Sequence, residues 1–278
     1  MPEGPEIRRE ADALAHALAG RELTHVEYRI AALAARGRRL RGARVLRVYP
    51  RGKALLIEFD RGVTHYSHNQ LYGQWRVLRP GRASEDTRAV RVVLGTADRI
   101  AILYSATEIE LLATDALARH PYLAKLGPDV LAPATTVRAI AARIEDPRYA
   151  RSSLAALLLD QRFIAGLGNY LRSEILHVAR LPGTLRPGDL DHAQRDALAR
   201  AIHTLPRQSY RTRGITNDLA FARAARAAGE AFEDYRFRVY DRAGLPCRTC
   251  GAPVARREAA GRGLFACPTC QPERPRRL

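Results

Sequence analysis

The sequence predicts a multidomain protein of the α+β class, and three changes of pattern along the chain support that prediction. Apolar residues recur at helical spacing from Pro5 to Ala19, then alternate with a period of two between residues 22 and 104. After Leu111 the helical spacing returns, and all four cysteines lie near the C-terminal end. A chain of 278 residues is long for one hydrophobic core. We therefore expect three domains, at residues 1–112, 113–230 and 237–271.

The first expected element is a helix from Pro5 to Ala19. Pro5 suits the first turn of a helix, and Gly20 suits the position just after its last residue. The apolar residues of this segment lie three or four positions apart and would form one buried face: Ile7, Ala11, Leu14, Ala15 and Leu18.

The residues before this helix have a second, chemical interpretation. Removal of Met1 would leave Pro2 as a free secondary amine, which can attack an electrophilic carbon and form an iminium ion. Glu3 supplies a carboxylate that can move protons at the same carbon. The alternative is an ordinary trimmed start that merely leads into a helix. These first residues alone do not decide between the two.

Short alternating runs with turn residues between them predict strands in the next part of the chain. Several short strands at this spacing indicate an antiparallel sandwich or barrel. The expected strands are Leu23–Ile30, Arg44–Val48, Ala54–Phe59, Val63–Ser67, Gln74–Leu78, Ala89–Leu94 and Ile100–Tyr104.

Lysine is rare in this chain. Of 46 basic residues two are lysines, Lys53 and Lys125, and the other 44 are arginines, which indicates a GC-rich codon bias. Lys53 falls in the turn Arg51-Gly-Lys53 between two expected strands. It either projects from the sheet edge for a functional reason or is an ordinary solvated turn residue.

The second half of the chain predicts helices. The turn Gly166-Leu-Gly-Asn169 precedes one of them and could bind an anion through backbone N–H groups, although such a sequence is also an ordinary turn. Residues 211–236 show no clear apolar face and are expected to be a mobile or weakly helical connection. The expected helices are one beginning at Thr114, one from Thr135 or Thr136 to Ile144, then Leu154–Leu159, Tyr170–Ala179 and Asp189–His203.

The four cysteines form two C-x2-C pairs, and this spacing predicts a zinc site. The pairs are Cys247 with Cys250, and Cys267 with Cys270. Disulfides are the alternative, and the lack of a secretion signal argues against them. Residues 252–266, between the pairs, should form a β-hairpin with Gly261-Arg262-Gly263 at or near its tip. Four thiolate ligands leave no open position for water, so one structural zinc ion is expected.

The charge of the chain indicates a polyanionic partner. Basic residues exceed acidic ones by 46 to 29, which gives a net charge of +17 and a pI near 10.6. Nucleic acid is the leading candidate, and a ribosomal or membrane-surface role is the alternative. Because the sequence has neither a long apolar run nor a signal-peptide pattern, we expect a cytoplasmic protein with no membrane partner.

Several motifs together resemble one family of DNA repair enzymes. The chain resembles the formamidopyrimidine-DNA glycosylase and endonuclease VIII family throughout, apart from residues 215–235, where it has extra residues. The motifs are Pro-Glu-Gly-Pro-Glu from Pro2, Arg-Gly-Lys-Ala-Leu from Arg51, His-Asn-Gln-Leu-Tyr-Gly from His68, Leu-Asp-Gln from Leu159, Ala-Gly-Leu-Gly-Asn-Tyr-Leu from Ala165, and the four-cysteine finger.

The resemblance implies a fold and the roles of several residues. The fold would be an N-terminal β-sandwich with a leading helix, a helical helix-two-turn-helix domain and a C-terminal zinc β-hairpin finger. Catalytic roles carry over to Pro2 as nucleophile, Glu3 as proton donor, Lys53 in proton transfer and phosphate contact, and Arg262 as phosphate grip. The residues that match DNA-contacting positions are Gln70, Leu71, Tyr72, Lys125 and Asn169. Glu6 and Glu174 match acidic positions that support the site.

The resemblance also implies the reaction and the partner. Damaged double-stranded DNA would be bound by a monomer in the bacterial cytoplasm, in association with the nucleoid, and no small-molecule cofactor would be needed. The string from His68 and the segment Pro206–Gly214 resemble the endonuclease VIII branch, which predicts excision of oxidised pyrimidines such as thymine glycol. The alternatives are an oxidised-purine glycosylase of the same family and a non-catalytic zinc-ribbon DNA-binding protein. A second metal at His65 and His68 is not expected, because no acidic residue lies close to them in the sequence.

Overall fold

The computed structural model describes residues 2–81 and 86–273, and the chain divides into two compact units, Met1–Lys125 and Leu126–Leu278. Each unit has its own large hydrophobic core. Within the described ranges, no helix is both long and apolar enough to cross a membrane.

Helix α1 opens the first unit and spans Gly4–Leu18, as the apolar spacing predicts. Glu3 is its N-cap in extended backbone, and the Glu6 carboxylate accepts a hydrogen bond from the Glu3 backbone N–H at 3.0 Å. This capping box satisfies backbone donors that lack a partner inside the helix. The buried face of α1 is formed mainly by Ile7, Ala11, Leu14 and Leu18.

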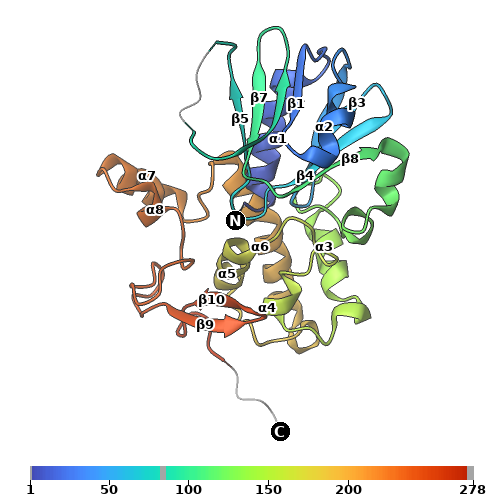
Figure 1. The fold of residues 1–278 in the computed structure, drawn as a ribbon. Helices are drawn as coiled ribbons and strands as arrows, with labels where there is room; N and C mark the ends of the chain where they lie inside the picture. The colour runs from blue at the N-terminus through green and yellow to red at the C-terminus, as the bar shows by residue number, and fades with distance from the viewer. Residues whose placement is uncertain (1, 82–85, 274–278) are drawn as a thin grey trace. The chain divides into compact units, whose positions relative to one another are not determined.

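Two four-stranded antiparallel sheets form the predicted sandwich (Figure 1). The sheets have the strand orders β1-β6-β7-β5 and β2-β3-β4-β8, and side chains from both share one core with α1. The strands are β1 (His25–Tyr28), β2 (Val45–Arg51), β3 (Ala54–Phe59), β4 (Val63–His68), β5 (Gln74–Leu78), β6 (Val90–Gly95), β7 (Ile100–Tyr104) and β8 (Glu108–Ala113).

Two elements of the first unit were not predicted. Helix α2 (Ala31–Arg38) has one buried residue, Gly37, and its alanines and arginines give little amphipathic signal. Strand β8 alternates glutamate with buried Ile109 and Leu111, but glutamate and leucine are also strong helix formers. Two short 3₁₀ helices, Thr114–Arg119 and Leu123–Lys125, follow β8 where a helix beginning at Thr114 was expected.

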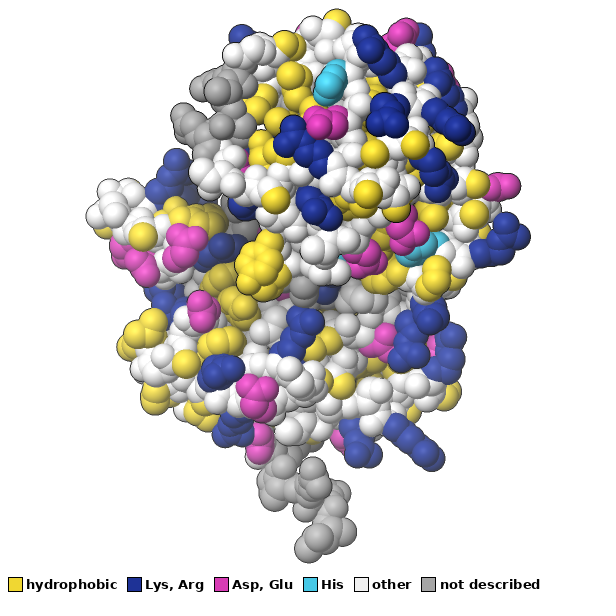
Figure 2. Space-filling model, in the orientation of Figure 1, with side chains coloured by type: hydrophobic (Ala, Val, Ile, Leu, Met, Phe, Trp, Pro, Cys, Tyr) yellow, Lys and Arg dark blue, Asp and Glu magenta, His cyan; other side chains and the backbone are white. Residues whose placement is uncertain are grey.

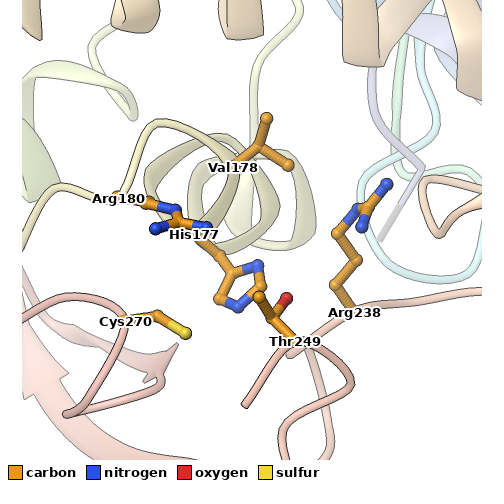
Figure 3. Close-up of a pocket in the computed structure, with 6 residues that line it drawn as sticks. All are labelled: His177, Val178, Arg180, Arg238, Thr249 and Cys270. Carbon is orange, nitrogen blue, oxygen red and sulfur yellow. The ribbon is translucent and has the colours of Figure 1, made fainter.

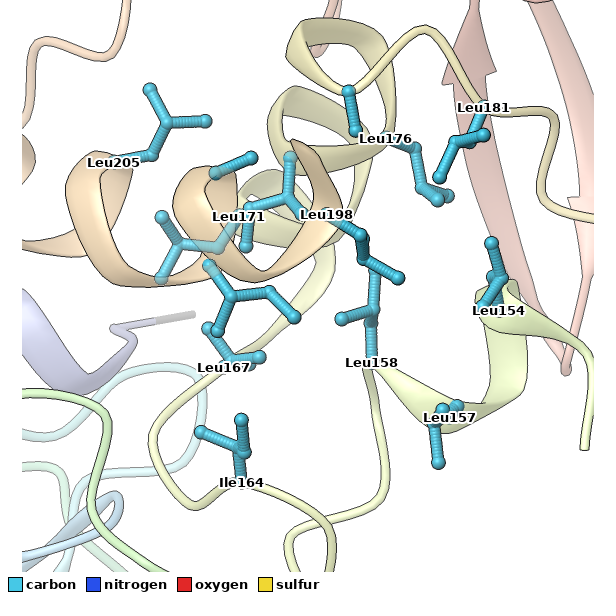
Figure 4. Close-up of a cluster of buried hydrophobic side chains, with 14 of the residues drawn as sticks. Leu154, Leu157, Leu158, Ile164, Leu167, Leu171, Leu176, Leu181, Leu198 and Leu205 are labelled. Carbon is cyan, nitrogen blue, oxygen red and sulfur yellow. The ribbon is translucent and has the colours of Figure 1, made fainter. Parts of the chain in front are cut away.

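Four helices enclose the core of the second unit. Figure 4 shows its buried leucines, which include Leu171 and Leu176 of α5 and Leu198 and Leu205 of α6. The predicted cap at Thr136 is present, because its hydroxyl accepts a hydrogen bond from the Ala139 N–H at 3.2 Å. The helices are α3 (Val137–Ile144), α4 (Leu154–Leu157), α5 (Asn169–Val178) and α6 (His192–Arg211), with 3₁₀ helices at Pro147–Tyr149 and Pro187–Asp189.

Helix α6 extends eight residues beyond the predicted end at His203, although Pro206 lies inside it. Proline removes one backbone hydrogen bond and normally ends or kinks a helix. Here Leu205, Pro206 and Ser209 are all buried, and burial of this face continues through the last turns. Tertiary packing therefore outweighs the local preference.

Residues 211–236, expected to be a mobile or weakly helical connection, are helical in part, and the prediction that they lack an apolar face was wrong. The segment forms α7 (Leu219–Ala227) and α8 (Phe232–Tyr235). Asp218 caps α7 by accepting hydrogen bonds from two backbone N–H groups at 2.9 Å. A small core of Ala222, Ala225 and Tyr235 joins the two helices. The buried face of α7 consists of alanines. Because alanine is common on both buried and exposed faces, the sequence showed little sign of this burial.

The second unit ends in an antiparallel hairpin of β9 (Ala255–Ala259) and β10 (Arg262–Ala266). Ala260 and Gly261 form its two-residue turn, with φ of +52° and +72°. Two positive φ values match the turn type that fits the twist of a hairpin, and glycine adopts them at little cost. Arg262 begins β10 opposite Ala259, so it lies beside the turn rather than at its centre.

Candidate active site, DNA-contacting loop and zinc centre

Pro2 and Glu3 lie at the start of α1. Glu3 is 2 % exposed and anchored by the capping box, whereas Pro2 is partly exposed. Once Met1 is removed, a free amine would stand next to this buried carboxylate, an arrangement that suits general acid–base chemistry at a carbon that the amine attacks. Met1, whose removal the predicted nucleophile requires, lies outside the described residues.

Lys53 occupies a two-residue turn between β2 and β3. Arg51 pairs with Ala54, so Gly52 and Lys53 alone connect the strands, and the φ of Gly52 is +60°. The Lys53 backbone N–H donates a hydrogen bond to the Tyr122 hydroxyl at 3.2 Å. Lys53 is 7 % exposed. The alternative of a solvated turn lysine therefore does not fit the structure.

Gln70, Leu71 and Tyr72 form a loop between β4 and β5 that projects into solvent. Leu71 is 57 % exposed and Tyr72 is 69 % exposed, so neither is a core residue at an ordinary strand end. Large apolar side chains held in solvent are typical of a binding surface. We call residues 69–75 the wedge loop.

The Gln70 side chain is held by the region at the start of β8. Its amide nitrogen donates to a Glu108 carboxylate oxygen at 3.1 Å, and its amide oxygen accepts from the Thr107 hydroxyl at 3.1 Å. The backbone of Gln70 has a φ of +47°, which few residues other than glycine adopt. Both side-chain contacts thus fix the conformation of the residue that begins the exposed part of the loop.

The other end of the wedge loop is held by Arg88. Its guanidinium donates to the Tyr72 carbonyl at 3.2 Å and to the Gln74 side-chain oxygen at 2.7 Å, and it pairs with Asp86. Sequence reasoning did not identify Arg88, because its partners are 14 to 16 residues away.

Of the two histidines of β4, His65 is held in the core. The His65 ring nitrogen Nδ1 hydrogen bonds to the Tyr28 hydroxyl at 2.9 Å, and burial lowers the pKa of His65 to about 3. A neutral histidine in the core is the result. Across the described residues, the cysteine cluster is the one group of potential metal ligands.

Lys125 is exposed at the end of a 3₁₀ helix, and Asn169 begins α5. The Asn169 amide donates to the Gly263 carbonyl of β10 at 3.0 Å and accepts from the Arg172 guanidinium at 2.7 Å. Arg172 is fully buried and also donates to the Ala259 and Arg262 carbonyls, at 2.9 and 3.3 Å. These contacts fix the turn beside Arg262, whose own side chain is exposed.

Glu174 is buried on the same helix and holds the chain that leads to the finger. Its carboxylate accepts from the Thr216 hydroxyl at 2.7 Å. It also accepts three backbone N–H bonds at 2.8 to 2.9 Å, from residues 238 to 240. Its role is therefore positioning within the second unit.

The four cysteine sulfur atoms are arranged to bind one zinc ion. All four lie within 4.8 Å of one another, with Cys247 and Cys270 at 3.9 Å and Cys250 and Cys267 at 3.4 Å. Tetrahedral zinc with Zn–S bonds of about 2.3 Å places its thiolates about 3.8 Å apart. The cysteines form no disulfides. Zinc therefore fits these ligands, and the disulfide alternative does not.

His177 connects the cysteine cluster to α5. Its Nε2 lies 3.4 Å from the Cys247 sulfur, and within the described chain its buried Nδ1 has no hydrogen-bond partner. Figure 3 shows the adjoining pocket, lined by His177, Val178, Arg180, Arg238, Thr249 and Cys270.

Family models match three successive parts of the chain. They describe the formamidopyrimidine-DNA glycosylase N-terminal domain (residues 1–108), the H2TH domain of the same glycosylase (residues 126–219) and a zinc finger found in FPG and IleRS (residues 244–272). Endonuclease 8 of Escherichia coli is 45% identical over 271 residues, which cover 98% of this chain and 100% of the relative. Endonuclease 8 of Shigella sonnei matches to the same extent. The chain belongs to the formamidopyrimidine-DNA glycosylase and endonuclease VIII family.

Solved structures of the family share the fold. MutM (Fpg) of Thermus thermophilus matches with a TM-score of 0.78 at 30% identity, covering 99% of this chain and 100% of that one. Lactococcus lactis Fpg, in a complex with DNA that contains N7-benzyl-Fapy-dG, matches with a TM-score of 0.79 at 22% identity, covering 98% and 100%. The predicted architecture of a sheet domain, a helix-two-turn-helix domain and a zinc finger is confirmed.

Proposed function

We propose that this chain is a bifunctional DNA glycosylase and abasic-site lyase of base-excision repair that uses the Pro2 nitrogen as its nucleophile. The proposal rests above all on the buried Glu3 carboxylate at the N-terminus of α1, directly beside Pro2. Full-length similarity to endonuclease 8 supports the same reaction class.

The chemistry follows from an amine and a carboxylate at one carbon. The Pro2 amine attacks C1′ of the damaged nucleotide and the bond from C1′ to the base breaks; the base leaves with the bonding electrons and takes up the proton that the amine loses. Glu3 donates a proton to the sugar ring oxygen, the ring opens, and the amine becomes an iminium ion. The iminium acidifies the C2′ proton, so loss of that proton expels the 3′ phosphate. A second elimination releases the 5′ phosphate, and water then hydrolyses the iminium to free Pro2.

Two further residues have roles in strand cleavage. Lys53 transfers protons and contacts phosphate during elimination, and its low exposure suits a lysine held in a site. Arg262 grips the phosphate at the lesion. Its exposed guanidinium and the fixed turn beside it support this role.

The DNA partner is damaged duplex. A base inside a duplex must be turned out before its C1′ can be attacked, and the gap must be filled. Exposed Leu71 and Tyr72, with Gln70, supply such a wedge. Lys125 and Asn169 contact the strand. Figure 2 shows Lys and Arg side chains spread over the visible face of both units, consistent with the net charge of +17.

The zinc ion stabilises the finger and takes no part in the reaction, because four cysteines occupy all its positions. We further propose that the enzyme acts as a monomer, without a small-molecule cofactor, in the bacterial cytoplasm at the nucleoid. Its domains are residues 1–112, 113–230 and 237–271.

The preferred lesion is an oxidised pyrimidine. The exposed Gln70-Leu-Tyr72 tip and the similarity to endonuclease 8 support this choice over an oxidised purine. The test compares excision of thymine glycol and of 8-oxoguanine from the same duplex in single-turnover assays. We expect faster excision of thymine glycol. Faster excision of 8-oxoguanine would make the chain a purine glycosylase, and binding without excision of either would leave a DNA-binding protein.

A further inference from the structure

A carboxylate on α1 lies beneath the wedge loop. Glu10 accepts a hydrogen bond from the Asn69 side-chain amide at 2.6 Å, across 59 residues of sequence. It also accepts one from the backbone N–H of Trp75. Asn69 begins the loop, and Trp75, the last of its defined residues, already belongs to β5, so one carboxylate joins the start of the loop to the strand that follows it.

The loop above this carboxylate is narrow. The Gly73 N–H donates to the Asn69 carbonyl at 2.8 Å, which closes the turn. A Cβ atom on Gly73 would lie 2.6 Å from that carbonyl oxygen and 2.7 Å from the Asn69 Cα. Real side chains do not approach backbone so closely, and the loop therefore depends on glycine here.

The tip of the loop gains little from apolar packing, because Leu71 and Tyr72 are largely exposed. Polar contacts at its base must therefore keep it in one conformation. A hydrogen bond to a charged carboxylate is shorter and stronger than one between neutral groups, and 2.6 Å fits that kind of bond.

We propose that Glu10 is a positioning residue that holds the wedge loop ready to enter the duplex, by binding Asn69 at its start and Trp75 in the following strand to helix α1. This inference rests on the proposed function, because it assigns a task to the same loop. The inference assigns a role in the proposed function to Glu10, a residue that is not proposed to contact the lesion or the reacting atoms.

The surroundings of Glu10 make this clamp sensitive to pH. Burial raises the pKa of Glu10 to about 7, and neighbouring Glu6 raises it further, whereas the bonds from Asn69 and Trp75 and the charge of Arg9 oppose the rise. Arg88 also interacts electrostatically with Glu10. A neutral carboxyl is a weaker acceptor, so the clamp should loosen as pH falls below about 7.

The test uses Glu10→Gln in the full-length, zinc-loaded protein. An amide has one acceptor oxygen in place of two and turns a donor towards the loop. Asp12→Asn is the matched control, because the Asp12 side chain is 41 % exposed on the same helix and pairs with Arg8. Two substrates separate an effect on the wedge loop from a general effect on cleavage. An abasic site in duplex DNA requires the wedge, and the same site in a single strand does not.

We expect Glu10→Gln to lower single-turnover cleavage of the duplex by about tenfold, as for loss of one charge-assisted bond. Single-strand cleavage should stay at the wild-type rate. The wild-type ratio of duplex to single-strand rates should rise with pH through about 7, and Glu10→Gln should remove that rise. Asp12→Asn should match wild type throughout.

Unchanged duplex cleavage in Glu10→Gln, or equal losses on both substrates, would overturn the inference. If Glu10→Gln fails to fold, Asn69→Ala removes the other partner and must give the same selective loss. A wild-type protein that cleaves neither substrate would instead refute the proposed function.

Discussion

Three glutamates, Glu3, Glu10 and Glu174, accept hydrogen bonds from backbone N–H groups of the segments beside them. Each lies where an element meets a segment with a proposed role: the N-terminus, the wedge loop and the chain leading to the finger. Carboxylates suit this task because they accept several bonds at once and have no donor to leave unsatisfied.

The pKa of Glu10 predicts how this residue affects stability. Its folded-state pKa of about 7 lies above the ordinary 4.5, so between these values the native state binds more protons than the unfolded chain. Its contribution to the free energy of unfolding therefore falls as pH rises through this window. Relative to Glu10→Gln, wild type should lose about 1–3 kcal/mol between pH 4.5 and pH 7.

Urea denaturation of both proteins at several pH values measures this difference. Asp12→Asn serves again as the control and should give no such slope. A constant difference between wild type and Glu10→Gln across the window would contradict the burial of the Glu10 carboxylate.

At the residue scale, the sequence predicted the groups that form local motifs and missed those whose partners are distant. Short sequence motifs contain Pro2, Lys53 and the cysteines, so each could be proposed from its neighbours in the chain. Glu10 meets Asn69 across 59 residues, and His177 meets Cys247 across 70. Nothing local marks such a pair, because the fold alone brings its members together.

At the scale of elements, strands with clear alternation were predicted well and alanine-rich helices were not. Strands β3, β5 and β7 have the expected bounds, since most of their buried residues are large and apolar. Helices α2 and α7 bury small residues, Gly37 in the first and Ala222 and Ala225 in the second. The α2 sequence shows little contrast between faces, whereas α7 is amphipathic and builds its buried face from alanines.

The zinc finger has only a small hydrophobic core of its own. Its small core consists largely of Val239, Val254, Phe265 and the cysteines, so the metal must supply much of its folding free energy. His177 of α5 lies 3.4 Å from the Cys247 sulfur and is placed to donate a hydrogen bond to it. Such outer contacts typically contribute 10–100-fold to metal affinity.

We expect His177→Ala to weaken zinc binding by about tenfold or more. Competition with a coloured chelator measures this directly, independently of any enzyme activity. His192→Ala, at the exposed start of α6, is the control. Equal zinc affinity of His177→Ala and wild type would show that the contact does not support the metal site.

At the scale of the whole molecule, the excess of basic residues should dominate DNA affinity. Binding that neutralises six to ten phosphates should weaken by roughly 10³–10⁵ between 50 and 200 mM salt. Lys125→Gln should reduce the salt slope by about one, as expected for loss of a single phosphate contact. A flat salt response would contradict an electrostatic role for the net charge of +17.

The central claim is that the Pro2 nitrogen forms the covalent intermediate, and borohydride reduction during turnover tests it most directly. Wild type is incubated with duplex DNA containing thymine glycol, and the reduced adduct is mapped by mass spectrometry. The account predicts a DNA adduct on Pro2, no adduct when an extra residue blocks the N-terminus, and much weaker trapping by Pro2→Gly. An adduct on another residue, or undiminished trapping by the blocked protein, would contradict it.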